Sequence, residues 1–283
     1  MGAAKLETSG HSIDTATGQN APAELSSDRV KKIFTDIAWD YERFNRLSSF
    51  GQYISWLETL IDKSPITPET QLLDIAGGTG DVSFMACNRK KPAKIVLSDY
   101  TPAMLDVAKE RLEEGENRGV PVELAVVDGQ DIPYEDESFD IITMSYGIRN
   151  MPKREQALSE MYRVLKPGGA LCVLEFSTPP NPLMRLGYRF YLRFGIPLWG
   201  KICTGDASGF IYLAKSIKAF PDQEGFAQML RDAGFTDIEW TNVTFGVAAV
   251  HIAHKRCRTT GANSSDHCTT SKDVVQCTIA DTQ

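Results

Sequence analysis

Five short apolar runs recur along the chain, and each ends at a glycine or a polar residue. We predict β-strands over these runs, at residues 71–77, 94–100, 122–129, 139–147 and 169–177. Residues 101–114 and 154–166 instead carry apolar residues three or four positions apart, and Pro167 and Gly168 end the second of these helical patterns. Strands that alternate with helices of this length predict an α/β fold with a doubly wound, parallel sheet.

Two aromatic-rich segments flank the predicted sheet. We expect residues 29–62 to form a helical lead-in and residues 181–220 to form an insertion after the fifth strand. An insertion this apolar is either a lid over a greasy acceptor or additional core. Residues 1–28 and 257–283 contain no aromatic residue, so we expect a flexible arm and a disordered tail around one domain at 29–256.

Composition narrows the class of protein. Hydrophobic residues make up 42% and charged residues 24% of the 283 residues, as in ordinary globular domains, and no apolar run is long enough to span a bilayer. The net charge of −7 argues against a nucleic acid partner, because phosphate binding needs a surplus of Lys and Arg. The six cysteines include no CxxC pair, so we expect no metal site and a reducing compartment. The first residues lack the pattern of a secretory signal, and we expect a cytoplasmic protein.

The first predicted strand ends in a glycine-rich turn, LDIAGGTGD at 73–81. Glycines let the backbone approach a ligand closely, and the helix that follows presents its N-terminus to negative charge. The spacing differs from the G-x-G-x-x-G of dinucleotide-binding proteins. The candidate ligand-binding residues of this segment are Asp74, Gly77, Gly78 and Gly80.

A second acidic residue, Asp99, ends the second predicted strand, roughly 20 residues further on. Its carboxylate can accept hydrogen bonds from both ribose hydroxyls, whereas Asp74 suits a cationic group. A ligand with a ribose and a cation but no pyrophosphate fits this pair, and S-adenosylmethionine is such a ligand. Asp128 and Gly129, after the third strand, extend the set and favour nucleoside binding. Taken alone, Asp99 also fits a solvated cap at a strand end.

Four further stretches carry a family likeness: RVLKPGGALCVLEFS at 163–177, GIRN at 147–150, GDASGFIYLAKSIKAFPDQEGF at 205–226 and VAAVH at 247–251. Together with the glycine-rich turn, they make residues 29–255 similar to class I methyltransferases, and among these to the ubiquinone/menaquinone biosynthesis C-methyltransferases of the UbiE type. The resemblance implies a mainly parallel seven-stranded sheet. It also implies methyl transfer from S-adenosylmethionine to a ring carbon of a prenylated quinol.

The resemblance further implies cofactor contacts, carried over position by position, at Thr79, Asp99, Asp128, Gly129 and Ser145. Ser145 lies near the end of the fourth predicted strand, where open α/β sheets bind their ligands. A hydroxyl there would equally satisfy the backbone of a turn.

Carbon methylation of a quinol suggests roles for four more residues. A quinol is a weak carbon nucleophile until a hydroxyl loses its proton, which a phenol-like pKa near ~10 opposes at neutral pH. We predict that Arg149 stabilises the phenolate, that Asn150 orients the quinol oxygen, and that Tyr41 or His251 relays the proton. Two of them have structural alternatives. Arg149 would equally serve as the ion-pair partner of an Asp or Glu, and His251 would equally fit a hydrogen-bonded histidine within a strand.

Two departures from the family pattern leave the acceptor open. Tyr53 and Phe220 stand where relatives usually carry histidine, in segments expected to face the acceptor. A methyltransferase for another small molecule or another ring position therefore stays an alternative. So does a catalytically silent scaffold of quinone biosynthesis that keeps the nucleotide fold.

The insertion also suggests partners. Arg185, Arg189, Arg193 and Lys201 interleave with aromatic residues, as in a helix that lies at a membrane interface. A solvated cationic helix face has the same pattern. Beyond the prenylated quinol, we expect peripheral membrane contact and a homodimer.

Overall fold

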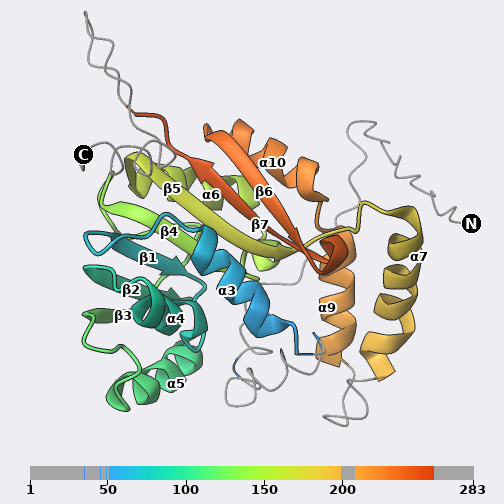
Figure 1. Cartoon of the computed structure of the whole chain (residues 1–283), viewed down its shortest axis with the longest axis horizontal. Helices are drawn as coiled ribbons and strands as arrows, with labels where there is room; N and C mark the ends of the chain where they lie inside the picture. Colours follow the sequence, from blue (N-terminus) through green and yellow to red (C-terminus); the bar gives the residue numbers. More distant parts are fainter. Residues whose placement is uncertain (1–34, 36–44, 46–48, 50, 199–207, 258–283) are drawn as a thin grey trace, which may run out of the picture.

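The computed structural model describes residues 35, 45, 49, 51–198 and 208–257. Seven strands form one sheet in the order β3-β2-β1-β4-β5-β7-β6, in which only β7 pairs antiparallel to its neighbours (Figure 1). The strands are β1 (Gln71–Ile75), β2 (Lys94–Asp99), β3 (Val122–Val126), β4 (Phe139–Ser145), β5 (Leu165–Phe176), β6 (Thr236–Val243) and β7 (Ala248–His254). The predicted doubly wound, mainly parallel seven-stranded sheet is confirmed.

Helices cover both faces of this sheet. One face packs against α3 (Tyr53–Lys63), α4 (Asp81–Arg89) and α5 (Pro102–Glu113). The other face packs against α6 (Arg154–Val164) and α10 (Gln223–Asp232). Each layer buries its own apolar cluster, so the sheet lies between two cores. Of the predicted lead-in, the described part is mainly α3, whose buried residues include Trp56 and Leu57.

Two strands differ from their predicted form. α6 ends at Val164, two residues earlier than predicted, because Leu165 already pairs with Phe139 as the first residue of β5. β3 is an edge strand, and its last residue, Val126, is 59% exposed, although the pattern predicts a strand buried on both faces.

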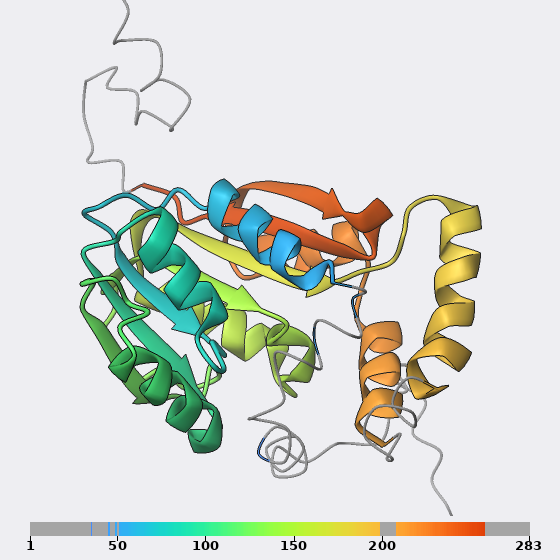
Figure 2. The ribbon, with the colours of Figure 1, turned by 60° about the horizontal axis from the view of Figure 1, so that its bottom comes forward.

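The insertion consists of α7 (Pro182–Phe190), the π-helical turn η3 (Tyr191–Gly195) and α9 (Ser208–Ala219). Figure 2 shows α7 and α9 side by side at one end of the molecule. η3, the turn after it and α9 form a small apolar cluster of their own, against which Tyr188 of α7 packs: Leu192, Ile196, Phe210, Leu213, Ala214 and Ile217. Within the described part of the chain, no helix is both long and apolar enough to cross a membrane. The predicted arm, and the tail beyond Cys257, lie outside the described residues.

Asp74 is a fully buried acidic residue in the middle of this fold. Its Oδ1 accepts a hydrogen bond from Thr143 Oγ1 of β4 at 2.8 Å, and its Oδ2 accepts one from Ser83 Oγ of α4 at 2.7 Å. Burial raises the pKa of Asp74 to about 7, and the two hydroxyl donors only partly oppose that rise. The carboxyl group thus joins a strand, a helix and a neighbouring strand beneath the glycine-rich turn.

Replacing Asp74 with Asn should change the pH dependence of stability. The folded chain holds the Asp74 proton more tightly than an unfolded chain does, where the ordinary pKa is 3.8. The wild type therefore loses stability as the pH rises from about 4 through 7. The Asp74→Asn variant has no carboxyl group to ionise there, so it keeps the stability that the wild type loses. Urea unfolding should show the variant gaining about 2–3 kcal/mol relative to wild type between pH 5 and pH 8. The same difference at both pH values would contradict burial of an ionisable group here.

Candidate functional site

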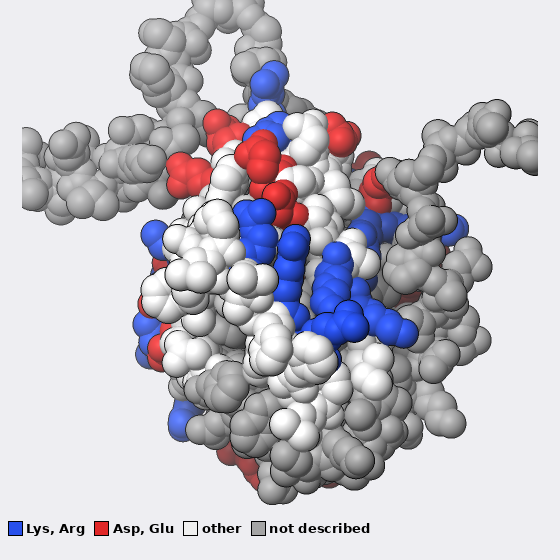
Figure 3. All heavy atoms as spheres, turned by 90° about the vertical axis from the view of Figure 1, so that its right-hand side faces the viewer, with Lys and Arg blue, Asp and Glu red and all other residues white. Residues whose placement is uncertain are grey.

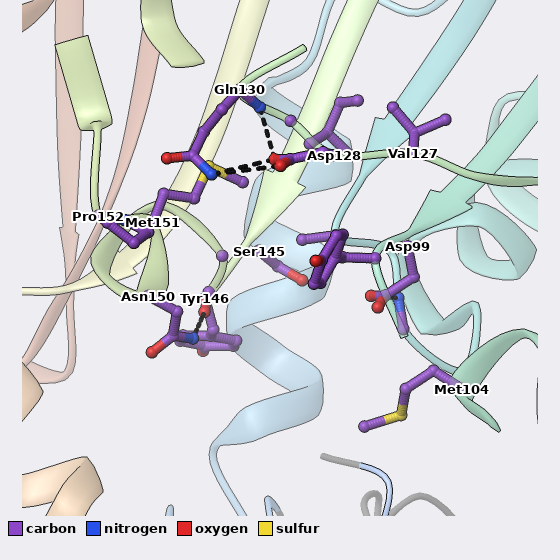
Figure 4. Close-up of a pocket in the computed structure, with 16 residues that line it drawn as sticks. Asp99, Met104, Val127, Asp128, Gln130, Ser145, Tyr146, Asn150, Met151 and Pro152 are labelled. Atoms are coloured by element: carbon purple, nitrogen blue, oxygen red, sulfur yellow. Dashed lines mark hydrogen bonds between the residues drawn. The ribbon is translucent and has the colours of Figure 1, made fainter. Parts of the chain in front are cut away.

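One pocket opens where the carboxyl ends of the parallel strands meet, at the edge where such sheets bind ligands. Its wall comes from the segments that follow β1, β2, β3 and β4 (Figure 4). The lining residues are Ile75, Ala76, Gly78, Asp99, Tyr100, Met104, Val127, Asp128, Gly129, Gln130, Ser145, Tyr146, Gly147, Asn150, Met151 and Pro152. In Figure 4, Asp99 and Met104 lie on one side of the pocket and Asn150 and Met151 on the other.

The backbone holds Asp99 in a fixed orientation at this pocket. Gly78 N–H donates to its Oδ2 at 3.0 Å, and Thr101 N–H donates to its Oδ1 at 2.8 Å. Burial raises the pKa of Asp99, and hydrogen bonds from the backbone of Thr101, Gly78 and Tyr100 and from the Thr101 side chain oppose the rise. The carboxylate lines the pocket, where ligand hydroxyls could reach its oxygens.

The glycine-rich turn shapes the pocket mostly from behind. Of the predicted turn residues, Gly78 lines the pocket, whereas Gly77, Thr79 and Gly80 do not. A Cβ at Gly77 would lie 2.8 Å from Asp74 Oδ2, so the turn packs directly on the buried carboxyl group. Gly80 has a φ of +95° at the N-terminus of α4, a conformation that favours glycine.

Asp74 lies behind the glycine-rich turn. Both carboxyl oxygens accept hydrogen bonds from hydroxyls of the core, and the residue does not line the pocket. It supports the turn from below.

An ion pair that the sequence did not indicate braces the same turn. Arg111 of α5 contacts Asp81 at 2.6 Å and donates to the Thr79 carbonyl at 3.0 Å. Tyr53 donates its hydroxyl to the other oxygen of Asp81 at 2.9 Å, and its ring stacks on Tyr146 with centroids 5.9 Å apart. Tyr53 thus joins α3 to the start of α4 and to Tyr146 of the pocket wall.

The three remaining predicted cofactor residues all line the pocket. Gln130 holds Asp128, donating from its backbone N–H at 2.9 Å and from its side chain at 3.1 Å. A Cβ at Gly129 would lie 2.7 Å from Met151 Cε, so a side chain there would have to displace the end of Met151. Ser145, at the end of β4, lies between the two sides of the pocket (Figure 4).

Asn150 belongs to the 3₁₀ turn η2 (Ile148–Asn150) and contributes an amide to the second side of the pocket. Its Nδ2 donates to the Tyr146 carbonyl at 3.1 Å, and its Oδ1 accepts from Tyr212 Oη of α9 at 2.8 Å. Burial raises the pKa of Tyr212, which keeps that hydroxyl a donor at neutral pH. Among the described contacts, the second hydrogen of the Asn150 amide has no acceptor.

Arg149 lies just behind Asn150 and does not itself line the pocket. Its Nη1 donates to Glu175 Oε1 at 2.8 Å and to the Tyr146 carbonyl at 2.6 Å. The guanidinium lies over the rings of Tyr146 and Phe176, 5.7 and 5.2 Å from their centroids. Both charges are buried, so the acidic partner considered for Arg149 in the sequence is present.

The structure describes one of the two predicted proton relays. Tyr41 lies outside the described residues. His251 is buried in β7, where its Nε2 is 3.1 Å from the Gln223 carbonyl, and it does not line the pocket. Burial lowers the pKa of His251 to about 4. His251 therefore matches the strand histidine of the alternative reading.

Phe220 is also a core residue. It is buried next to Phe226, with the Arg154 guanidinium 5.4 Å from its ring centroid. Arg154 in turn donates to the Arg149 carbonyl at 3.1 Å, which connects Phe220 to η2.

The charges of the pocket indicate what it can hold. Among the described lining residues there are two carboxylates and neither Lys nor Arg. A pyrophosphate would find no cation there, whereas a cationic nucleoside finds acceptors and apolar walls. These acceptors and apolar walls therefore fit S-adenosylmethionine better than a dinucleotide.

Comparisons with known proteins agree with this geometry. Residues 23–255 match the ubiE/COQ5 methyltransferase family. A ubiquinone/menaquinone biosynthesis C-methyltransferase UbiE from Dinoroseobacter shibae is 42% identical over 226 residues, which cover 80% of this chain and 90% of that protein. A protein of the same name from Francisella tularensis subsp. novicida is 41% identical over 237 residues, which cover 83% and 94%.

Solved structures of lower identity share the fold. The [4+2]-cyclase SpnF superimposes with a TM-score of 0.61 at 17% identity, over 86% of this chain and 100% of that one. A phosphoethanolamine N-methyltransferase 2 from Haemonchus contortus gives a TM-score of 0.54 at 18% identity, over 73% and 53%. On the match over most of its length, the chain belongs to the ubiE/COQ5 methyltransferase family.

Proposed function

We propose that this protein transfers a methyl group from S-adenosylmethionine to a ring carbon of a prenylated quinol. The observation that carries the proposal is a single pocket with two unlike sides. One side offers carboxylate acceptors without a cation, and the other offers the Asn150 amide. The names of the relatives, which are quinone-biosynthesis C-methyltransferases, support the same reaction.

On the first side, Asp99 would accept hydrogen bonds from the ribose hydroxyls, because its carboxylate lines the pocket and backbone donors orient it. Met104 and Val127 give apolar walls for a flat base, and Asp128 offers acceptors for an amino group. Ser145 lies between this half and the acceptor half (Figure 4). When bound, S-adenosylmethionine supplies an electrophilic methyl group on a sulfonium centre.

On the second side, the residues of η2 would orient the acceptor. Asn150 has one amide hydrogen available for a quinol oxygen, and Tyr212 and Tyr146 hold the amide in place. Orientation of the ring carbon toward the methyl group is the main requirement, because the donor is intrinsically reactive. Arg149, one residue away, would stabilise negative charge on the quinol oxygen even though Glu175 shares its charge.

A labelled-methyl assay tests the function. The protein would be incubated with methyl-labelled S-adenosylmethionine and a panel of demethylated quinols that are open at different ring positions, and the products analysed by mass spectrometry. We expect label on a ring carbon of at least one prenylated quinol. Cofactor binding without transfer to any quinol would favour a silent scaffold, and transfer only to a different small molecule would replace the proposed acceptor.

Asp99→Ala should weaken cofactor binding by about 10- to 100-fold, because charge-assisted hydrogen bonds to the ribose are lost. Calorimetry with S-adenosylmethionine measures the effect. Asp106→Ala, which removes an exposed carboxylate of α5, serves as the control for charge and should bind normally. Unchanged affinity of Asp99→Ala would remove Asp99 from the site.

Two variants separate the chemistry of Arg149 from its buried ion pair. Arg149→Met alone leaves Glu175 without its cation and should cost about 3–5 kcal/mol of stability. Arg149→Met combined with Glu175→Gln removes both charges and should recover most of that stability. Turnover of the double variant should stay about 100-fold or more below wild type. Near-normal turnover of the double variant would show that Arg149 only neutralises Glu175.

The prenylated acceptor also bears on where the enzyme works. A quinol with a long isoprenoid chain resides in a bilayer, so the enzyme would act as a peripheral membrane protein. We also propose that the chain forms a homodimer, and sedimentation of the purified chain would test this.

A further inference from the structure

An apolar stripe runs along the outside of the insertion. The chain is continuously helical over 182–198, through α7, η3 and one further turn. Five large apolar side chains recur along it every three or four residues, and all are exposed: Leu183, Leu186, Phe190, Phe194 and Leu198. Leu183 is 77% and Phe190 67% exposed. A three- to four-residue spacing places these side chains along one face of the helix.

This stripe is distinct from the face that packs on the protein. Leu192 and Ile196 are buried against α9, with Tyr188 packed beside them. At 100° per residue these positions lie roughly opposite Phe190 and Phe194. The helix therefore already has its core contact, and the apolar side chains on its outer face need another explanation. Exposed apolar stripes of this kind mark interaction surfaces.

The charge around the stripe contrasts with that of the whole chain. Residues 176–221 contain six basic residues and one acidic residue, although the chain carries a net charge of −7. Arg189 and Arg193 are exposed beside the stripe, and within the described residues neither has a carboxylate at ion-pair distance. Figure 3 shows Lys and Arg side chains gathered on this side of the molecule next to uncharged surface.

We propose that the outer face of residues 182–198 docks on an anionic lipid bilayer. Phenylalanine and leucine side chains would enter the boundary between headgroups and acyl chains, and Arg189 and Arg193 would contact lipid phosphates. A protein partner would need an acidic, apolar groove, whereas a bilayer needs only the combination already present. No covalent step is involved.

The position of the stripe links this surface to the pocket. The helical segment packs on α9 through Leu192 and Ile196, and α9 packs on η2 and holds Asn150 through Tyr212 at 2.8 Å. Between a docked helix and the acceptor side of the pocket would thus lie α9 and then η2. This consequence, delivery of a membrane-dissolved acceptor, rests on the proposed function, whereas the docking itself does not.

Vesicle sedimentation tests the docking with the full chain and without cofactor or quinol. The probes are phosphatidylcholine vesicles with and without phosphatidylglycerol. We expect the wild type to pellet with the anionic vesicles. Phe190→Ser should lower the partition coefficient by about tenfold. Arg189→Gln with Arg193→Gln should lower it by about tenfold or more on anionic vesicles.

Val126→Ser is the matched control, because it removes an equally exposed apolar side chain from β3, at the other end of the molecule in Figure 1. It should bind vesicles as the wild type does. Wild-type protein that stays in the supernatant, or Phe190→Ser that binds normally, would overturn the proposal. A wild-type dimer that Phe190→Ser dissociates, with no vesicle binding, would assign the stripe to a second copy and would also overturn it. Because no methyl transfer is measured, failure of the proposed reaction leaves this readout intact.

Discussion

The buried carboxyl group of Asp74 is the interaction on which the site depends most. It lies under the glycine-rich turn and bonds to hydroxyls of α4 and β4, so it fixes how the turn sits between the helix and the sheet. Gly77 packs directly on it. With the turn held there, the Gly78 N–H points at Asp99 and sets the orientation of that carboxylate. A shift of the turn would therefore move the donor that orients Asp99.

The second half of the pocket depends on a different buried charge. Arg149 and Glu175 join η2 to β5, and Arg149 also donates to the Tyr146 carbonyl. Tyr146 has a φ of +57° at the end of β4, an unfavourable conformation for a large side chain that neighbouring contacts must maintain. Asn150 is positioned by this arrangement and by Tyr212 from the insertion. The two halves thus depend on different buried charges, are linked by Tyr53 and open into one cavity.

Features encoded in contiguous sequence could be predicted, and those made by distant residues could not. The glycine turn and Asp99 follow apolar runs, and parallel strands must bring such ends together. Tyr212 and Asn150 are 62 positions apart, and Tyr53 and Asp81 are 28 positions apart. No local sequence pattern therefore predicts either hydrogen bond. β6 was not located, because its alternation of exposed and half-buried residues resembles a polar loop. The burial of Asp74 depends on α4 and β4, which sequence spacing does not reveal.

We propose that one cavity holds the nucleoside at Asp99 and the acceptor at Asn150. A crystal structure with S-adenosylhomocysteine tests it most directly. The account predicts both ribose hydroxyls within about 3.2 Å of the Asp99 carboxylate, with the sulfur facing open space in front of the Asn150 amide. A ligand bound elsewhere, or a sulfur separated from Asn150 by protein, would contradict it.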